Sequence, residues 1–394
     1  MANLTGGVIA QGNTDFNLTQ ASEQVTLDVM NDPYIKLFRK FGIFNDASKK
    51  AAERGKGDLV KMPNVFRLNS KGDNPAISAY AQAKTMEFGQ REIRLGEYKN
   101  TFEYERPETL SKQRDSFDIL SKYDQEMMSQ HERDRICLGI FQQLCGNTAT
   151  SVEAPLIADT AFNTTAELLN LRLQTTTKAP TSQYFAYGSA AALANPAAIT
   201  ATNAPLTMQD LQLAKVAITR NYAGVNRWGR LKSNEAMAIC FVSETGGFQL
   251  INQARAASAD STLSQTRYSL IEGGKKWEGL NSFYSADVNM IIVTVPDDIM
   301  SRAVHNGTEN ALSRCAVIVG GGALDFAIGS AFPGVDGPSY KLQVDDTTAP
   351  LDDKIFIGLR SILAGEKVQL NGFGANAGNL YDHATYVIAH SAAS

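Results

Sequence analysis

Three observations in this 394-residue sequence predict an α+β fold organised around one long helix. Residues 108–145 contain a single interior glycine, Gly139, and place apolar residues three or four positions apart, which is typical of one helix face. Before this stretch lie two strand-like runs joined by turn residues, and after it short apolar runs alternate with helical patterns. The apolar positions of the long helix are Phe117, Leu120, Tyr123, Met127, Leu138, Phe141 and Leu144.

Local signals mark both ends of this helix. Pro107 precedes it, Thr109 or Ser111 supplies the N-cap oxygen, and Gly146 follows its last turn. At a rise of roughly 1.5 Å per residue the helix is about 55 Å long, which exceeds the width of a small domain. The charged residues 130–135 interrupt its apolar stripe. We therefore expect that a single core does not cover its whole length, and that another segment, of this chain or of a neighbour, packs against it.

The composition describes a globular chain. Hydrophobic residues make up 43% and charged residues 20%, the formal net charge is −4, and the length favours two or three domains. This net charge does not suggest a nucleic-acid-binding protein. The four cysteines show no CxxC spacing or disulfide framework, which fits a reducing compartment. We find no signal peptide and no apolar run of about 18 residues, and so expect no membrane span.

The N-terminal part changes character along its length. Residues 1–22 are polar and predict an arm without a core, whereas residues 24–44 have helical periodicity that Asp32-Pro33 divides into two short helices. Residues 34–61 hold eight basic and three acidic residues, a local net charge of +5. Two interpretations stay open, a solvated helix face and a patch that faces a polyanion. The candidate patch comprises Lys36, Arg39, Lys40, Lys49, Lys50, Arg54 and Lys56.

A β-hairpin is predicted next. Residues 57–69 and 83–95 have the pattern of two strands, residues 69–75 between them are rich in turn formers, and a third extended run covers residues 98–104. These strands contain few large apolar residues, and a hairpin of this kind makes a poor core by itself. We therefore expect it to project and to find its partner elsewhere. The candidate contact residues are Asn69, Lys71, Asp73, Arg91 and Arg94.

The part of the chain after residue 150 predicts a mixed α/β domain. Residues 147–206 are rich in Thr and Ala and poor in charge, which indicates a long loop or an exposed insertion. Thr207 is the expected N-cap of a helix that ends near Asn221, and residues 248–259 predict another helix. The last 40 or so residues are expected to return toward the long helix. Strands are expected at residues 236–243, 280–295 (two), 315–328 (two, joined by a glycine turn) and 384–390. Residues 339–344 and 354–363 predict strands, or a strand plus a short helix.

No arrangement of residues predicts catalysis. Residues 319–323, VGGGA, follow an apolar strand as a dinucleotide-binding turn does, but Asp325 occupies the position of the third glycine, so we favour a β-turn or bulge. The four histidines have no metal-ligand spacing. The acidic pairs Asp297-Asp298, Asp345-Asp346 and Asp352-Asp353 lie in turn contexts typical of solvated loops. We expect no enzymatic activity, no cofactor and no metal.

The order of the parts resembles that of the major capsid proteins of tailed phages, which have the Hong Kong 97-type fold. The local sequence is similar to the capsid family of N-four-type podophages in four short stretches: residues 57–60, 98–105, 127–146 and 200–221. The resemblance implies that the long helix is the spine helix and the hairpin is the E-loop. The implied parts are an N-terminal arm with a short basic helix at 1–55, the E-loop at 56–106, the spine helix of the P-domain at 107–150, an A-domain with a Thr/Ala-rich insertion at 151–350, and C-terminal strands returning to the P-domain at 351–394.

The resemblance also implies a function. Such a protein self-assembles into the pentamers and hexamers of an icosahedral shell that encloses double-stranded DNA. Its partners are itself, decoration and portal proteins, and packaged DNA held by non-specific electrostatics at the basic patch, without a membrane. Its location is the virion shell after assembly in the host cytoplasm. The E-loop candidates then contact a neighbouring subunit. We assign no covalent crosslink.

Three other functions stay open at this stage. A tail or decoration protein of a virion fits the composition but does not need the long helix. A nucleotide-binding α/β enzyme fits only if residues 319–323 bind a phosphate. A surface adhesin or secreted glycoprotein is suggested by the Asn-X-Ser/Thr sequons at Asn3, Asn17, Asn163 and Asn306, although no signal peptide supports it.

Overall fold

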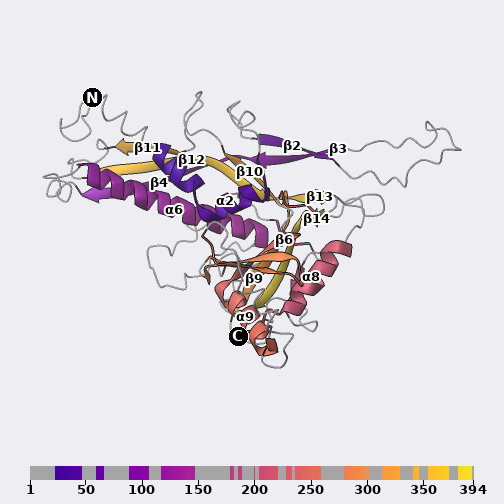
Figure 1. Cartoon of the computed structure of the whole chain (residues 1–394). Coiled ribbons are helices and arrows are strands. Elements are labelled where there is room, and N and C mark those ends of the chain that lie inside the picture. The colour runs from indigo at the N-terminus through magenta and orange to yellow at the C-terminus, as the bar shows by residue number, and fades with distance from the viewer. Residues whose placement is uncertain are drawn as a thin grey trace, which may run out of the picture.

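The computed structural model describes two packed sheets with helices between and beside them, and a hairpin that extends away from the body (Figure 1). The residues described are 23–46, 59–65, 88–105, 117–146, 178–181, 185–188, 199, 204–220, 228–232, 236–258, 279–297, 299–300, 313–328, 340–345, 354–371 and 380–392.

The first sheet has five strands and carries the long helix. Its path runs β1 (Phe44–Asp46), β10 (Leu324–Ile328), β12 (Lys354–Lys367) and β11 (Tyr340–Asp345), and β4 (Gly96–Glu105) also pairs with β12. Helix α6 (Phe117–Cys145) packs on β12 and runs along this sheet (Figure 1). It has 29 described residues, which corresponds to roughly 43 Å at the standard helical rise. Gly146 ends it with φ +73°, so the predicted stop is confirmed.

The second sheet has six strands and forms the other half of the body. Its order is β5 (Phe185–Tyr187), β15 (Thr385–Ser391), β9 (Ser313–Val319), β6 (Ala238–Ser243), β8 (Met290–Val295) and β7 (Ser282–Ser285). Strands β6, β9 and β15 are buried throughout, which explains their nearly continuous apolar runs. Helix α9 (Glu244–Ser258) packs on β6 and β8, and α8 (Met208–Arg220) packs near β15. As predicted, Thr207 caps α8, since its Oγ1 accepts the Asp210 N–H at 3.2 Å.

Two short two-stranded sheets complete the described part of the chain. Strands β2 (Leu59–Val65) and β3 (Phe88–Arg94) pair antiparallel, which confirms the predicted hairpin. The third extended run forms β4 and pairs with β12 instead of with the hairpin. Strands β13 (Gln369–Asn371) and β14 (Leu380–Asp382) form the other pair.

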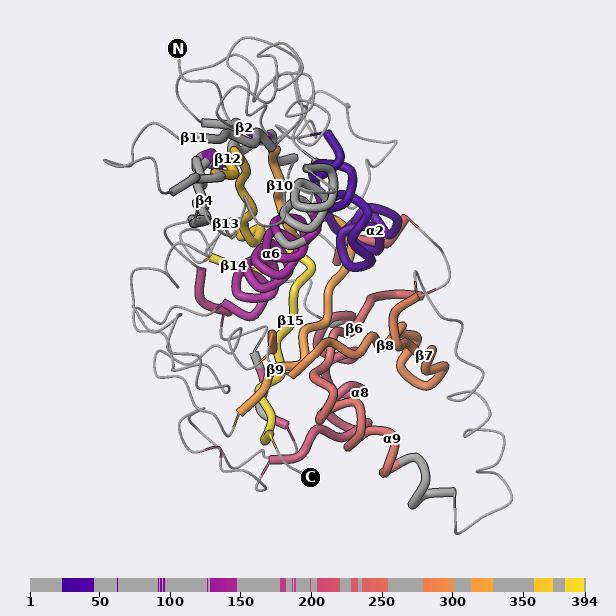
Figure 2. Tube along the Cα trace, turned by 90° about the vertical axis from the view of Figure 1, so that its left-hand side faces the viewer, coloured from indigo at the N-terminus to yellow at the C-terminus, as the bar shows by residue number. Residues whose placement is uncertain are grey.

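Helix α2 (Pro33–Lys40) lies beside α6 (Figure 2). Asp32 caps it by accepting the N–H groups of Tyr34 and Ile35 at 2.8 and 3.2 Å. Its apolar face carries Leu37 and Phe38, both with no exposed surface. The second of the two short helices predicted in residues 24–44 is therefore confirmed, and its amphipathic face builds part of the core.

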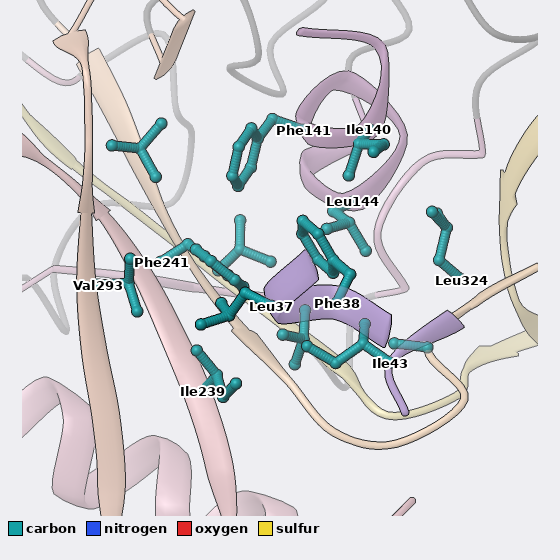
Figure 3. Close-up of a cluster of buried hydrophobic side chains, with 14 of the residues drawn as sticks. Leu37, Phe38, Ile43, Ile140, Phe141, Leu144, Ile239, Phe241, Val293 and Leu324 are labelled. Atoms are coloured by element: carbon teal, nitrogen blue, oxygen red, sulfur yellow. The ribbon is translucent and has the colours of Figure 1, made fainter. Parts of the chain in front are cut away.

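A chain of aromatic rings joins the two sheets through α2. Phe38 stacks on Phe241 of β6 with ring centroids 5.1 Å apart and on Phe44 of β1 at the same distance. Phe44 in turn stacks on Phe326 of β10 at 4.7 Å. Phe141 of α6 meets Phe241 edge-on at 5.3 Å (Figure 3). The two sheets and both helices thus share one apolar core, in which such ring pairs add to simple area burial.

The C-terminal part of the chain divides between the two sheets. Strand β12 lies against α6, whereas β15 lies inside the six-stranded sheet between β5 and β9. Similarly β9 and β10 are separated only by residues 320–323 but belong to different sheets. The glycine turn is therefore the crossing point between the sheets, and not the tip of a hairpin.

Candidate assembly site

The root of the β2–β3 hairpin is fixed by an ion pair. Arg91 on β3 donates from Nε to Asp325 Oδ2 at 2.8 Å and from Nη2 to Oδ1 at 2.9 Å. Asn45 on β1 donates to the same Oδ1 at 2.9 Å. Beneath the hairpin, Met62 and Ile93 bury their side chains with Ala364 of β12. The hairpin thus leaves the body from a small apolar contact and one two-pronged salt bridge.

The predicted contact residues of the hairpin have different outcomes. Arg91 makes an ion pair within the chain and its side chain is 16% exposed. The position of Arg94 is opposite Leu59 at the root, and its side chain lies outside the described residues, as do Asn69, Lys71 and Asp73. For all five residues the assignment to a contact between subunits stays a prediction.

Two charged residues in the middle of α6 are buried and paired with each other. Glu132 has no exposed surface and Arg135 is 2% exposed, and Arg135 Nη2 donates to Glu132 Oε2 at 2.9 Å. The same Nη2 lies 3.4 Å from the Ser361 hydroxyl of β12. The pair therefore binds the spine helix to the long strand of its own chain.

Coverage of α6 changes along its length. Residues 135–146 are buried on every side by the same chain, and the buried set includes Leu138, Phe141 and Leu144, as predicted. Glu126, Gln130 and Asp134 are exposed and follow one another at four-residue spacing. One exposed polar face therefore runs along the middle of the helix. The expectation that one core does not cover the whole length of the helix thus holds: one face of its middle is exposed, whereas its last three turns are buried.

The basic patch is described only at its first three members. Lys36 and Lys40 are exposed and Arg39 is half-buried on α2. Lys49, Lys50, Arg54 and Lys56 lie outside the described residues. Arg39 and Lys40 occupy the last turn of α2, where cations interact favourably with the helix dipole. This local role accounts for part of the positive charge without a polyanion.

The glycine turn has no free N–H groups for a phosphate. The N–H groups of Gly320, Gly321 and Gly322 donate to the carbonyls of Ala384, Gly229 and Gly42 at 2.8, 2.9 and 2.9 Å. A phosphate-binding loop needs such N–H groups to point at its ligand. The predicted turn is confirmed, and the nucleotide-binding interpretation loses its site.

Three further observations concern the surface and the polar groups of the described residues. No described helix is long and apolar enough to cross a membrane. Among the described residues, no three His, Cys, Asp or Glu side chains are grouped as metal ligands would be. On α8, Leu213 and Val216 are exposed at 60% and 41%, and on α9 Phe248 is 53% exposed. These apolar side chains lie on the two helices that cover the six-stranded sheet.

Sequence reasoning missed Asp325 and Asn45 as members of the hairpin root. In the sequence, Asp325 stands out only because it occupies the position of the third glycine of a dinucleotide-binding turn. One signal was present in the sequence, because a carboxylate within an apolar strand needs a partner when it is buried. The identity of that partner depends on the pairing of β1, β10 and the hairpin, which lie far apart in the sequence.

The fold is similar to that of solved phage capsids. The capsid of Ralstonia phage GP4 matches with a TM-score of 0.61 at 14% sequence identity, covering 91% of this chain and 91% of that chain. The capsid of cyanophage Pam1 matches with a TM-score of 0.52 at 12% identity, covering 89% of each chain. No family model and no curated protein sequence matches this chain. At these identities the comparison shows a shared fold, and it extends over nearly the entire chain.

Proposed function

We propose that this chain, which has the Hong Kong 97-type capsid fold, is a major capsid protein whose copies assemble into an icosahedral shell around double-stranded DNA. The observation that carries the proposal is the end-to-end match to the GP4 capsid over 91% of both chains. The match therefore extends over nearly the entire length of both chains and is not confined to one sheet or one helix. In this proposal the chain is a structural component of the virion shell and has no enzymatic activity.

The geometry of the hairpin supports assembly with other copies. It extends from the body, and its two strands form a sheet of their own (Figure 1). Two-stranded hairpins are at best marginally stable in water. A surface supplied by a neighbouring copy stabilises such a hairpin, and repeated contacts of this kind close into rings when the subunits are related by rotation. Many modest contacts per subunit then give a stable shell.

The proposal includes the division of the chain into an arm with its short helix, an E-loop, a spine helix, an A-domain and returning C-terminal strands. In this division the short helix α2 packs in the core.

The proposal also names the partners of the shell protein. Packaged DNA is proposed to lie against the basic patch, where Lys36 and Lys40 offer exposed charge on α2. Such contacts neutralise phosphate without reading sequence. Portal and decoration proteins are the other proposed partners, and assembly takes place in the host cytoplasm. The resemblance to N-four-type podophages stays a prediction.

Hairpin shortening tests the proposed function. Val65 and Phe88 lie directly opposite each other at the far end of the β2–β3 ladder, so a two-residue Asn-Gly turn can replace residues 66–87. We expect the full-length chain to form rings or closed shells in negative-stain electron microscopy and light scattering. The shortened chain should keep its circular dichroism spectrum and lose these particles.

Two results would contradict this proposal. If the full-length chain stayed a monomer or dimer at every protein concentration, alone and with the other head proteins of its phage co-expressed, a shell function would be wrong. If the shortened chain assembled as well as the full-length chain, the hairpin would not be an assembly element. A tail or decoration protein remains the second candidate, and helical tubes without closed shells would favour it.

A further inference from the structure

The direction of the β2–β3 hairpin is determined over a short stretch of chain. Strand β3 ends at Arg94 and β4 begins at Gly96, so only Leu95 separates the hairpin from the five-stranded sheet. Strand β4 is held along its whole length by β12. Among the described strands, β2 and β3 pair only with each other. The angle between hairpin and sheet therefore depends on the few side-chain contacts near Leu95.

The apolar contacts at this point are few. Met62 and Ile93 are buried against Ala364, with Leu95 partly buried beside them. Apolar contacts of this size favour association but are not directional, so they tolerate rotation of one strand pair over another. A directional interaction is needed to select one angle.

The Arg91–Asp325 pair supplies that directional interaction. A guanidinium that donates two N–H groups to one carboxylate fixes orientation as well as distance. Asp325 is itself rigidly placed, because its residue pairs with Asn45 of β1 on one side and with Glu366 of β12 on the other. Its side chain is 4% exposed, so solvent screens this pair less than a surface salt bridge. Asn45 adds a third hydrogen bond that holds the carboxylate from the β1 side.

We propose that Arg91 and Asp325 are positioning residues that set the direction in which the hairpin leaves the subunit, and thereby the place where it meets a neighbouring copy. The first part of the proposal concerns the isolated subunit. The second part rests on the proposed function. A hairpin that extends far from its anchor amplifies a small change of angle at the root into a large displacement at its end.

The direct test measures a distance within one subunit. Nitroxide labels are attached to cysteines introduced at Asn64, near the end of β2 that is farther from the root, and at Gln212, which is exposed on α8. The four native cysteines are buried and react slowly. Pulsed electron paramagnetic resonance on dilute, unassembled subunits then gives the distance distribution between hairpin and body.

Four variants make the test specific. D325N and R91Q each remove the ion pair while keeping a side chain of similar size. The matched control is E366Q, which removes the partner of Lys178 from the residue directly opposite Asp325 on β12. The double variant R91D/D325R restores a pair of opposite charges in reversed order. Circular dichroism shows which variants fold. If D325N does not fold, the distance distribution of R91Q alone tests the role of the ion pair.

We expect a narrow distribution in the unmodified chain and in E366Q, at least a twofold broader or displaced one in D325N and R91Q, and recovery in R91D/D325R. An unchanged distribution in folded R91Q, or an equal change in E366Q, would overturn the proposal. Particle size by electron microscopy tests its second part. Altered hairpin direction with normal shells would refute the link to assembly. If the unmodified chain formed no particles, either alone or with the other head proteins co-expressed, the proposed function would fail, while the distance result would still decide the role of the pair.

Discussion

Lys367 and Asp382 form an ion pair in which both side chains are completely buried, with Nζ 3.0 Å from Oδ2. Gln369 donates to the other carboxylate oxygen at 2.7 Å, and the Thr181 backbone N–H donates to Oδ2 at 3.3 Å. The pair joins the end of β12 to β14, near the C-terminal end of α6. Burial lowers the pKa of Lys367, and the attraction of Asp382 opposes this effect.

The first prediction concerns the removal of one partner from this pair. D382N leaves the Lys367 ammonium in an apolar setting without a counter-charge, and we expect a loss of about 3–5 kcal/mol in the free energy of unfolding. The double variant K367M/D382L removes both charges and should recover most of that loss. Urea unfolding of dilute subunits, followed by tryptophan fluorescence, measures both values.

The matched control uses a partly exposed pair of the same kind. Lys178 and Glu366 are 2.8 Å apart with the Lys178 side chain 34% exposed. K178M should therefore change stability by less than about 1 kcal/mol. If D382N and K178M lowered the free energy of unfolding equally, burial would not explain the contribution of the Lys367–Asp382 pair to stability.

The second prediction concerns the aromatic chain between the sheets. Phe38 has no exposed surface and stacks on both Phe44 and Phe241. We expect F38A to lower the free energy of unfolding by about 3–5 kcal/mol, because a large buried ring is lost and the cavity cannot close between two rigid sheets. F38L should cost clearly less, since it fills most of the space.

The control substitution for this prediction is L27A, since Leu27 is 56% exposed on the helix at residues 23–30. We expect the free energy of unfolding of L27A to lie within about 0.5 kcal/mol of that of the unmodified chain. If F38A were as mild as L27A, α2 would be an attached arm and not part of the core.

Sequence patterns located most of the elements correctly where periodicity was strong. Residues 238–242 and 386–389 are continuous apolar runs, and both lie in fully buried strands. Thr207 and Gly146 are local signals whose geometry depends only on neighbouring residues, so they were readable without tertiary structure. The spine helix was predicted for the same reason. The stretch 108–116 lies outside the described residues.

Other features depend on pairings between distant segments, which no local pattern encodes. Periodicity identified β9 and β10 as strands but did not show that they join different sheets. The buried pair Glu132–Arg135 resembled a solvated interruption, because the sequence does not reveal that β12 covers this face. Arg91 resembled a surface cation for the same reason. Its partner Asp325 is 234 positions away in the sequence.

The third prediction concerns the glycine turn between the sheets. A Cβ on Gly321 would lie 2.1 Å from the Arg230 carbonyl oxygen, and this backbone atom cannot move without displacing the segment 228–232. We expect G321A to lower the free energy of unfolding by at least about 3 kcal/mol, beyond an ordinary overpacking cost of 1–3 kcal/mol. At Gly279 a Cβ meets nothing within 4 Å, although φ is +82°. G279A should therefore cost only about 1–2 kcal/mol. Similar values for the two variants would contradict close packing at the turn.

The fourth prediction concerns acid. Burial lowers the pKa of His383 and of His390 from 6.5 to about 4 in each case. Arg91 also lowers the pKa of His383 and Asp325 raises it, whereas the Ser391 carbonyl raises that of His390. In the unfolded chain both groups titrate near 6.5. Between pH 6.5 and 4 the unfolded chain therefore binds protons that the folded chain does not.

The sign follows from this difference in proton binding. The stability that comes from keeping each imidazole neutral is fully present above pH 6.5 and is lost as the pH falls toward 4, with a total of about 3 kcal/mol for each histidine. Urea unfolding at pH 7.5, 6.5, 5.5 and 4.5 should show a plateau and then a decline. H390Q and H383Q should each reduce that decline, because glutamine does not titrate. If both variants kept the full decline, the acid sensitivity would come from carboxylates and not from these two buried rings.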